Sequence, residues 1–191
     1  MFDNNYFTLM KKYLTLINFL FLCSFLYGQN APYAPEKMTW KWFRAKDKTC
    51  EIKIPASWSV EENFGDYRFF VRSYYDSEKD RFMENISVFI QENPIGKPDE
   101  RLKNYIEDVK TELPKILGKI ELSEPKFFTA KGMQLCELVC KHNQGGLALK
   151  WKQISYVKGS KIVTITFTAE EIAYKNYEAV ANVIMLSFNM L

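Results

Sequence analysis

Apolar residues recur at alternate positions in several short segments of the first half of the chain, a pattern typical of strands. Strand-forming residues fill Cys50–Ile54, Tyr67–Tyr75 and Glu84–Gln91. The charged segment 76–83 separates the last two and is expected to be a loop. The first half of the chain therefore predicts three strands.

The second half combines two helical segments with four further strands. Apolar residues recur at helical spacing after Asp99 and again after Glu171, which predicts one helix that kinks or ends at Pro114 and another that closes the chain. Strands are expected between the helices at about 120–129, 133–142, 147–157 and 161–169. The links Asn143–Gly146 and Gly159-Ser160 are short and turn-like, so the last three strands are expected to form an antiparallel meander.

The predicted meander carries apolar residues on both faces. With tight turns, Leu138 is expected to face Trp151, and Cys140 to face Leu149. The opposite face carries a second apolar set: Leu135, Val139, Ile154, Tyr156, Val163, Ile165 and Phe167. An antiparallel sheet with one wet face would alternate more cleanly, so we expect one helix on each face. The sequence predicts an α+β fold, an α/β/α sandwich with an antiparallel β-sheet of about six to seven strands.

The first 28 residues have the three parts of a secretion signal: a basic start, a short apolar run and a small residue at its end. Lys11 and Lys12 precede the uncharged run Tyr13–Tyr27, and Gly28 and Gln29 flank the expected cleavage point. The run is short for a membrane-spanning helix, which needs about 20 apolar residues. We therefore expect an exported protein, periplasmic or extracellular, that contacts the membrane only through this segment before cleavage.

This signal divides the chain into three parts. Residues 1–28 are expected to be removed, residues 29–35 to form a flexible mature N-terminus, and residues 36–191 to form one domain. Translation starting at Met10 is a hypothesis, because the residues before it add no positive charge to the signal. Two alternatives remain open: an uncleaved membrane anchor and a lipoprotein modified at Cys23.

His142 is the sole histidine of the chain, so any Ser-His-Asp or Cys-His arrangement must use it. It is expected in solvent at a hairpin tip, about 7 Å along the strand from Cys140, whereas a hydrogen bond needs about 3 Å. A zinc site from Cys136, Cys140 and His142 would lack a fourth ligand. We therefore expect no catalytic, cofactor-binding or metal-binding residues. A hydrolase or thiol enzyme that uses His142 with Cys140 or Cys136 is the alternative, and a disulfide from Cys50 to either cysteine stays open.

Charge and aromatic content bear on the partner. The whole chain carries +3 and the predicted signal +1, so the mature part carries +2, with basic and acidic residues interspersed. Nucleic acid, which needs a concentrated basic face, is therefore not an expected partner. Exposed aromatic side chains often mark interfaces, which makes Tyr67, Phe69, Tyr74 and Tyr75 the candidate contact surface. Packing of these residues in the core is the alternative.

The order of these elements resembles the PsbP-like superfamily over about residues 40–189. The positions that carry the resemblance are Pro55, Trp58, Asn85–Val88, Leu102, Tyr105, Tyr174, Tyr177 and Ser187-Phe188. This fold is shared by the extrinsic protein of the oxygen-evolving complex, a nuclear import factor that binds the Ran GTPase, and bacterial exported proteins of the DcrB type. The resemblance implies a non-catalytic binding or assembly module without a cofactor. We expect a monomer whose partner is an envelope protein or a small hydrophobic ligand.

Overall fold

The computed structural model describes residues 33–75, 80–93 and 96–191. The predicted signal, with its cleavage point at Gly28 and Gln29, and most of the predicted flexible segment 29–35 lie outside these residues. The described elements are η1 (Pro35–Lys37), β1 (Trp40–Arg44), β2 (Cys50–Pro55), β3 (Ser59–Phe64), β4 (Tyr67–Arg72), β5 (Asn85–Glu92), α2 (Pro98–Leu117), β6 (Ile120–Leu122), β7 (Lys126–Ala130), β8 (Met133–Gln144), β9 (Leu147–Lys158), β10 (Lys161–Glu170), α3 (Tyr174–Ser187) and β11 (Asn189–Met190).

The described strands form two antiparallel sheets. The large sheet has eight strands in the order β3-β4-β5-β10-β9-β8-β6, with β7 also paired to β8. A small sheet has the order β1-β2-β11. The predicted count of six to seven strands is therefore too low. The chain between 120 and 129 forms two strands because Pro125, which has no N–H to donate, lies between β6 and β7.

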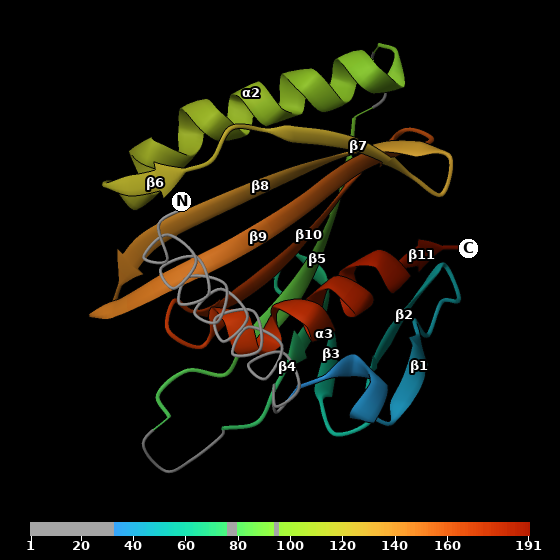
Figure 1. Ribbon diagram of the computed structural model, residues 1–191. Coiled ribbons are helices and arrows are strands. Elements are labelled where there is room, and N and C mark those ends of the chain that lie inside the picture. Colours follow the sequence, from blue (N-terminus) through green and yellow to red (C-terminus); the bar gives the residue numbers. More distant parts are fainter. Residues whose placement is uncertain (1–32, 76–79, 94–95) are drawn as a thin grey trace, which may run out of the picture.

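The two helices lie on opposite faces of the large sheet (Figure 1). Helix α3 packs over a core that includes Ile154, Ile165 and Phe167, while α2 places Leu102 and Ile106 against β8 and β9. The α+β class and a helix on each face are thus confirmed. Helix α2 continues past Pro114 and ends at Leu117, where Gly118 has a φ of 74°.

The meander of β8, β9 and β10 is confirmed, but its register differs from the predicted one by two residues. Leu138 pairs with Gln153 and Cys140 with Trp151, because β8 continues to Gln144 and turns through Gly145-Gly146. Both glycines have positive φ, 59° and 80°, as a two-residue type I′ turn requires. A shift of two residues keeps every side chain on the same face, so the prediction of two apolar faces survives it.

None of the helices among the described residues is long and apolar enough to cross a membrane.

Candidate functional site

His142 lies in β8 and is buried, with 9% of its surface exposed. The expectation of a solvated histidine at a hairpin tip is wrong, because β8 extends two residues beyond it and Ile120 of β6 pairs alongside. Its Nε2 lies 3.4 Å from Oε1 of Gln144, and its buried Nδ1 has no hydrogen-bond partner among the described residues. The histidine is therefore part of the sheet edge rather than of an open loop.

The three cysteines of the predicted mature chain are buried in two different parts of the core. Cys136 and Cys140 lie under α2, whereas Cys50 lies in the core under α3, and all three are free thiols. Burial raises the pKa of the Cys140 thiol to about 11; for Cys136, burial and the neighbouring carboxylate of Glu137 do the same. Since the thiolate is the reactive form, these thiols are poor nucleophiles at neutral pH.

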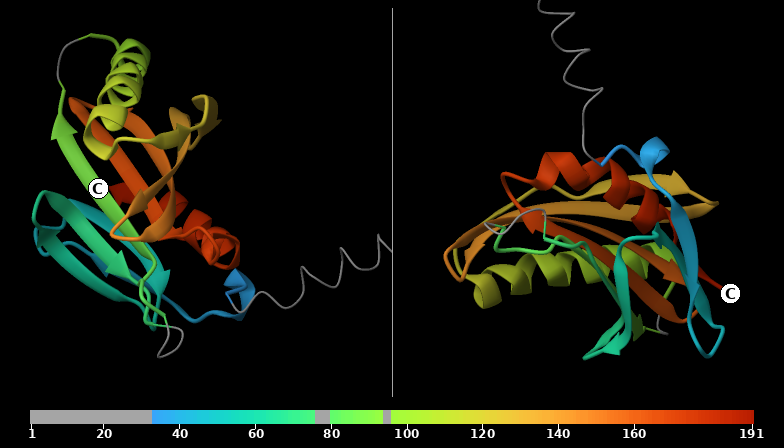
Figure 2. Two further views of the ribbon diagram at one scale, coloured as in Figure 1. Left: turned by 90° about the vertical axis from the view of Figure 1, so that its left-hand side faces the viewer. Right: turned by 90° about the horizontal axis from the view of Figure 1, so that it is seen from below.

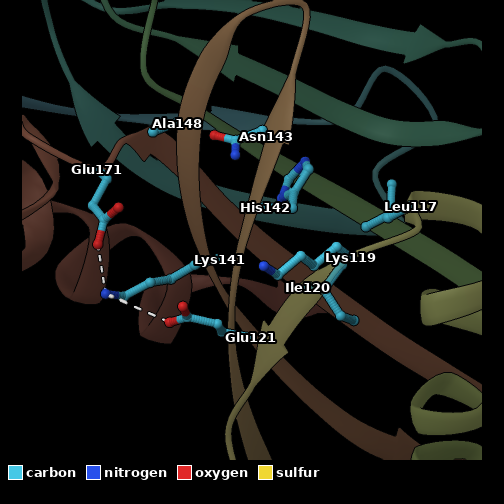
Figure 3. Close-up of a pocket in the computed structure, with 9 residues that line it drawn as sticks. All are labelled: Leu117, Lys119, Ile120, Glu121, Lys141, His142, Asn143, Ala148 and Glu171. Atoms are coloured by element: carbon cyan, nitrogen blue, oxygen red, sulfur yellow. Dashed lines mark ion pairs between the residues drawn. The ribbon is translucent and has the colours of Figure 1, made fainter.

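A hollow of about 390 Å³ lies beside His142, where the end of α2 meets β6 and β8 (Figure 3). Three of its charged side chains, those of Lys141, Glu121 and Glu171, pair with one another. Lys141 Nζ lies 2.5 Å from a carboxylate oxygen of Glu171 and 4.0 Å from one of Glu121, and the hydrogen bond and charge of Glu171 raise the pKa of Lys141.

This hollow brings together no nucleophile, base and orienting group. No hydrogen bond joins His142 to a thiol or carboxylate among the described residues, and no group of three or more potential metal ligands occurs there. The structure therefore does not assemble the predicted alternative, an enzyme that uses His142 with Cys140 or Cys136.

The aromatic residues of β4 divide between the two faces of the sheet. Phe69 is completely buried in the core under α3, so its assignment to the candidate contact surface is wrong. Tyr67, 38% exposed, would share that face if the strand were regular, but a β-bulge between Tyr67 and Phe69 shifts the register. Tyr67 therefore pairs with Phe89 and joins Phe70 on the opposite face, 5.9 Å between ring centroids.

The bulge creates a cluster that we call the outer aromatic face, formed by Phe64, Tyr67, Phe70 and Arg72. Phe64, at the end of β3, is 41% exposed, and its ring centroid lies 5.0 Å from that of Phe70. The Arg72 guanidinium lies 4.7 Å from the Phe70 centroid and 5.1 Å from the Phe64 centroid. Arg72 also pairs with Glu61 at 3.0 Å, so this cation is neutralised at the border of the cluster.

The outer aromatic face lies on the side of the sheet that α2 covers, but away from α2. The helix packs chiefly against β6, β8 and β9, whereas the face is carried by β3 and β4 at the other edge of the sheet (Figure 2). Exposed aromatic rings on this edge are therefore a feature of the surface rather than of a helix interface.

Tyr74 and Tyr75 are also exposed, but they follow the other end of β4. At about 3.3 Å per residue they lie about 25 Å along the chain from Tyr67, so the predicted residues do not form one surface. Sequence reasoning missed Phe64 and Arg72. The signal that could have found Phe64 is the Gly65-Asp66 turn between two strand-like segments, which indicates a hairpin.

No protein-family model matches the sequence, and no curated protein matches it significantly. Solved structures do match. LpqN of Mycobacterium tuberculosis, involved in cell envelope biogenesis, superposes with a TM-score of 0.60 at 13% identity, over 81% of this chain and 91% of LpqN. CyanoP, the cyanobacterial PsbP of Synechocystis sp. PCC 6803, gives 0.57 at 16% identity, over 81% of this chain and 94% of CyanoP. The chain has the PsbP/Mog1-like fold.

This fold also includes the Ran-binding protein Mog1p of Saccharomyces cerevisiae, which matches with a TM-score of 0.54 at 15% identity, over 81% of this chain and 96% of Mog1p. The predicted resemblance is thereby confirmed as a likeness of fold. At these identities, function does not transfer with the PsbP/Mog1-like fold.

Proposed function

We propose that the chain is an exported, non-catalytic binding module that contacts an envelope protein through its outer aromatic face. The observation that carries the proposal is the exposure of Phe64 and Tyr67 on a part of the sheet that no described helix covers. Aromatic residues and arginine are enriched at protein interfaces, and this cluster combines both. Other proteins of this fold include a Ran-binding protein and one involved in cell envelope biogenesis, which supports a binding role without naming the partner.

The charges around the face indicate an apolar contact segment on the partner. Arg72 is the cation of the cluster, and its ion pair with Glu61 carries no net charge. When a ring of this protein packs against an apolar side chain of the partner, the contact contributes roughly 25 cal/mol per Å² of apolar surface removed from water. We therefore expect a segment with one or two large apolar side chains that stack on Phe64 and Phe70.

Site-specific photo-crosslinking in the native cells tests this proposal. A photoreactive phenylalanine analogue replaces Phe64 or Tyr67 in two variants. In two matched controls it replaces Ile116 or Ile172, which are strongly exposed but lie on α2 and just before α3. We expect one protein to be crosslinked from both positions of the face and from neither control. Equal yields at all four positions, or no adduct at the face, would overturn the proposal.

The export part of the proposal has its own test. The mass of the mature protein in the envelope fraction is expected to correspond to a chain that begins at Gln29. A mass that retains the apolar run Tyr13–Tyr27 would instead support the membrane-anchored alternative.

A further inference from the structure

An apolar cleft of about 210 Å³ opens on the α3 side of the sheet, on the face opposite the outer aromatic face. Its lining residues come from the β7–β8 hairpin, from β9 and from the C-terminal end of α3 with the residue that follows it; Figure 1 shows where these elements lie. The side chains that define it are Leu135, Ile154, Tyr156, Met185, Leu186 and Phe188. All but Leu186 are buried, and Leu186 is 42% exposed at the mouth. The cleft is therefore a solvent-accessible opening into an otherwise closed apolar core.

The size of the cleft suits one alkyl chain. An apolar cavity of about 150 Å³ stays dry and binds benzene, which has six carbons. By simple proportion, the larger volume here corresponds to about eight carbons of a chain. A drug-sized ligand fills pockets of about 300–1,000 Å³, so the cleft is too small to enclose a larger molecule.

Lys131 places a positive charge at the rim of this cleft. It occupies the first position of the two-residue turn Lys131-Gly132 between β7 and β8, where its φ is 50°. Asn or Gly is the usual choice there, because positive φ is unfavourable for a residue with a long side chain. The Lys131 Nζ lies 3.5 Å from the carbonyl oxygen of Phe188, which lines the cleft.

Lys131 has no carboxylate partner among the described residues. Lys158 has none there either; its Nζ donates to the carbonyl oxygen of Met190, two residues after Phe188. The cleft lining itself contains no acidic side chain. Lys131, a cation without an acidic partner among the described residues, thus belongs to the lining of an apolar opening. This arrangement complements a molecule with an apolar chain and an anionic end.

We propose that the cleft binds a single alkyl chain that ends in a carboxylate or a phosphate, with the chain on Leu135 and Tyr156 and the anionic end at Lys131. Each buried methylene contributes about 0.8 kcal/mol, so affinity rises about fourfold per carbon. The rise stops once the cleft is full, at about eight carbons. The proposal does not depend on the outer aromatic face, which lies on the other side of the sheet.

Titration calorimetry on the protein purified from the envelope fraction of its own host tests the proposal. The probes are octanoate, octyl phosphate and the uncharged octanol, and shorter carboxylates give the dependence on chain length. We expect saturable binding in which at least one anion binds about 1.4- to fivefold more tightly than octanol, since an exposed charge pair contributes about 0.2–1 kcal/mol. The preferred anion identifies the head group.

Lys131→Asn separates binding from folding. Asparagine tolerates the positive φ, so the variant is expected to melt at or above the wild-type temperature while its preference for the anion over octanol disappears. The matched control is Lys48→Asn, which removes the same charge at another positive φ, 60°, in the turn between β1 and β2. Leu186→Gln is expected to weaken the binding of all three probes.

The proposal is overturned by any of three results. These results are octanol binding as tightly as both anions in the wild type, Lys131→Asn keeping the same preference for the anion as Lys48→Asn, and no saturable binding of any probe.

Discussion

Two adjacent phenylalanines of β4 provide a sharp test, because the structure gives them opposite environments. Phe69 is completely buried, with its ring 5.4 Å from Phe43 and 6.1 Å from Phe188 between centroids. Phe70 is half-buried on the outer aromatic face. Truncating a buried Phe to Ala costs about 3–5 kcal/mol, a large part of the about 5–15 kcal/mol that stabilises a typical domain.

We therefore expect Phe69→Ala to lower the melting temperature by about 6–20 °C, because 1 kcal/mol shifts it by about 2–4 °C at this chain length. Phe70→Ala removes a ring that is already in contact with solvent and is expected to cost about 1 kcal/mol or less. For both variants, thermal unfolding gives the melting temperature and urea unfolding gives the free energy of unfolding, each followed by tryptophan fluorescence. Phe69→Leu serves as a milder variant if Phe69→Ala does not fold. Equal destabilisation at the two positions would refute the assignment of Phe70 to the surface.

Two further predictions concern buried ionisable groups. Cys136 and Cys140 have thiol pKa values raised to about 11 from an ordinary value of 9.0, so the folded protein loses stability as the pH rises from 9 towards 11. At pH 8 a shift of that size leaves about 100-fold less thiolate, so alkylation in the native state is expected to be at least about 100-fold slower than in urea. Fast labelling of either thiol would revive the thiol-enzyme alternative. Lys152 is buried and bonded to Glu178 at 3.1 Å, and Lys152→Met is expected to cost about 1–3 kcal/mol by chemical unfolding. Burial opposes ionisation of Glu178, but Lys175 and Lys152 outweigh it and lower its pKa below 4.5. The wild type therefore loses stability as the pH falls below that value, and Lys152→Met is expected to lose less stability over the same pH range. If the two proteins lose the same amount of stability at acid pH, Lys152 and Glu178 are not coupled.

The large features of the fold could be predicted because they depend on side-chain periodicity. Alternate residues of a strand point to opposite faces, so apolar residues on both faces of the meander required a cover on each side. That inference tolerated an error of two residues in register, because Leu138 keeps its face whether it pairs with Trp151 or with Gln153.

The missed features are those in which local geometry overrides periodicity. The bulge after Tyr67 changes the face of that side chain, and nothing in a strand-rich stretch specifies a bulge. Strand β3 is polar and lies at the sheet edge, so its pattern resembles a loop until the Gly65-Asp66 turn pairs it with β4. His142 is buried because β6 pairs with β8 beside it, and the position of β6 depends on the whole chain between the two strands.

The central claim is that the outer aromatic face is covered by a partner in the envelope. Hydroxyl-radical footprinting tests it without any substitution, by comparing the oxidation of Phe64 and Tyr67 in intact cells and in the purified protein. Tyr74 and Tyr75 are internal controls, because they are aromatic residues that follow the far end of β4 and are more exposed than Phe64 and Tyr67. We predict that Phe64 and Tyr67 are protected several-fold in cells while Tyr74 and Tyr75 are not. Equal oxidation of all four residues in the two samples would contradict the claim.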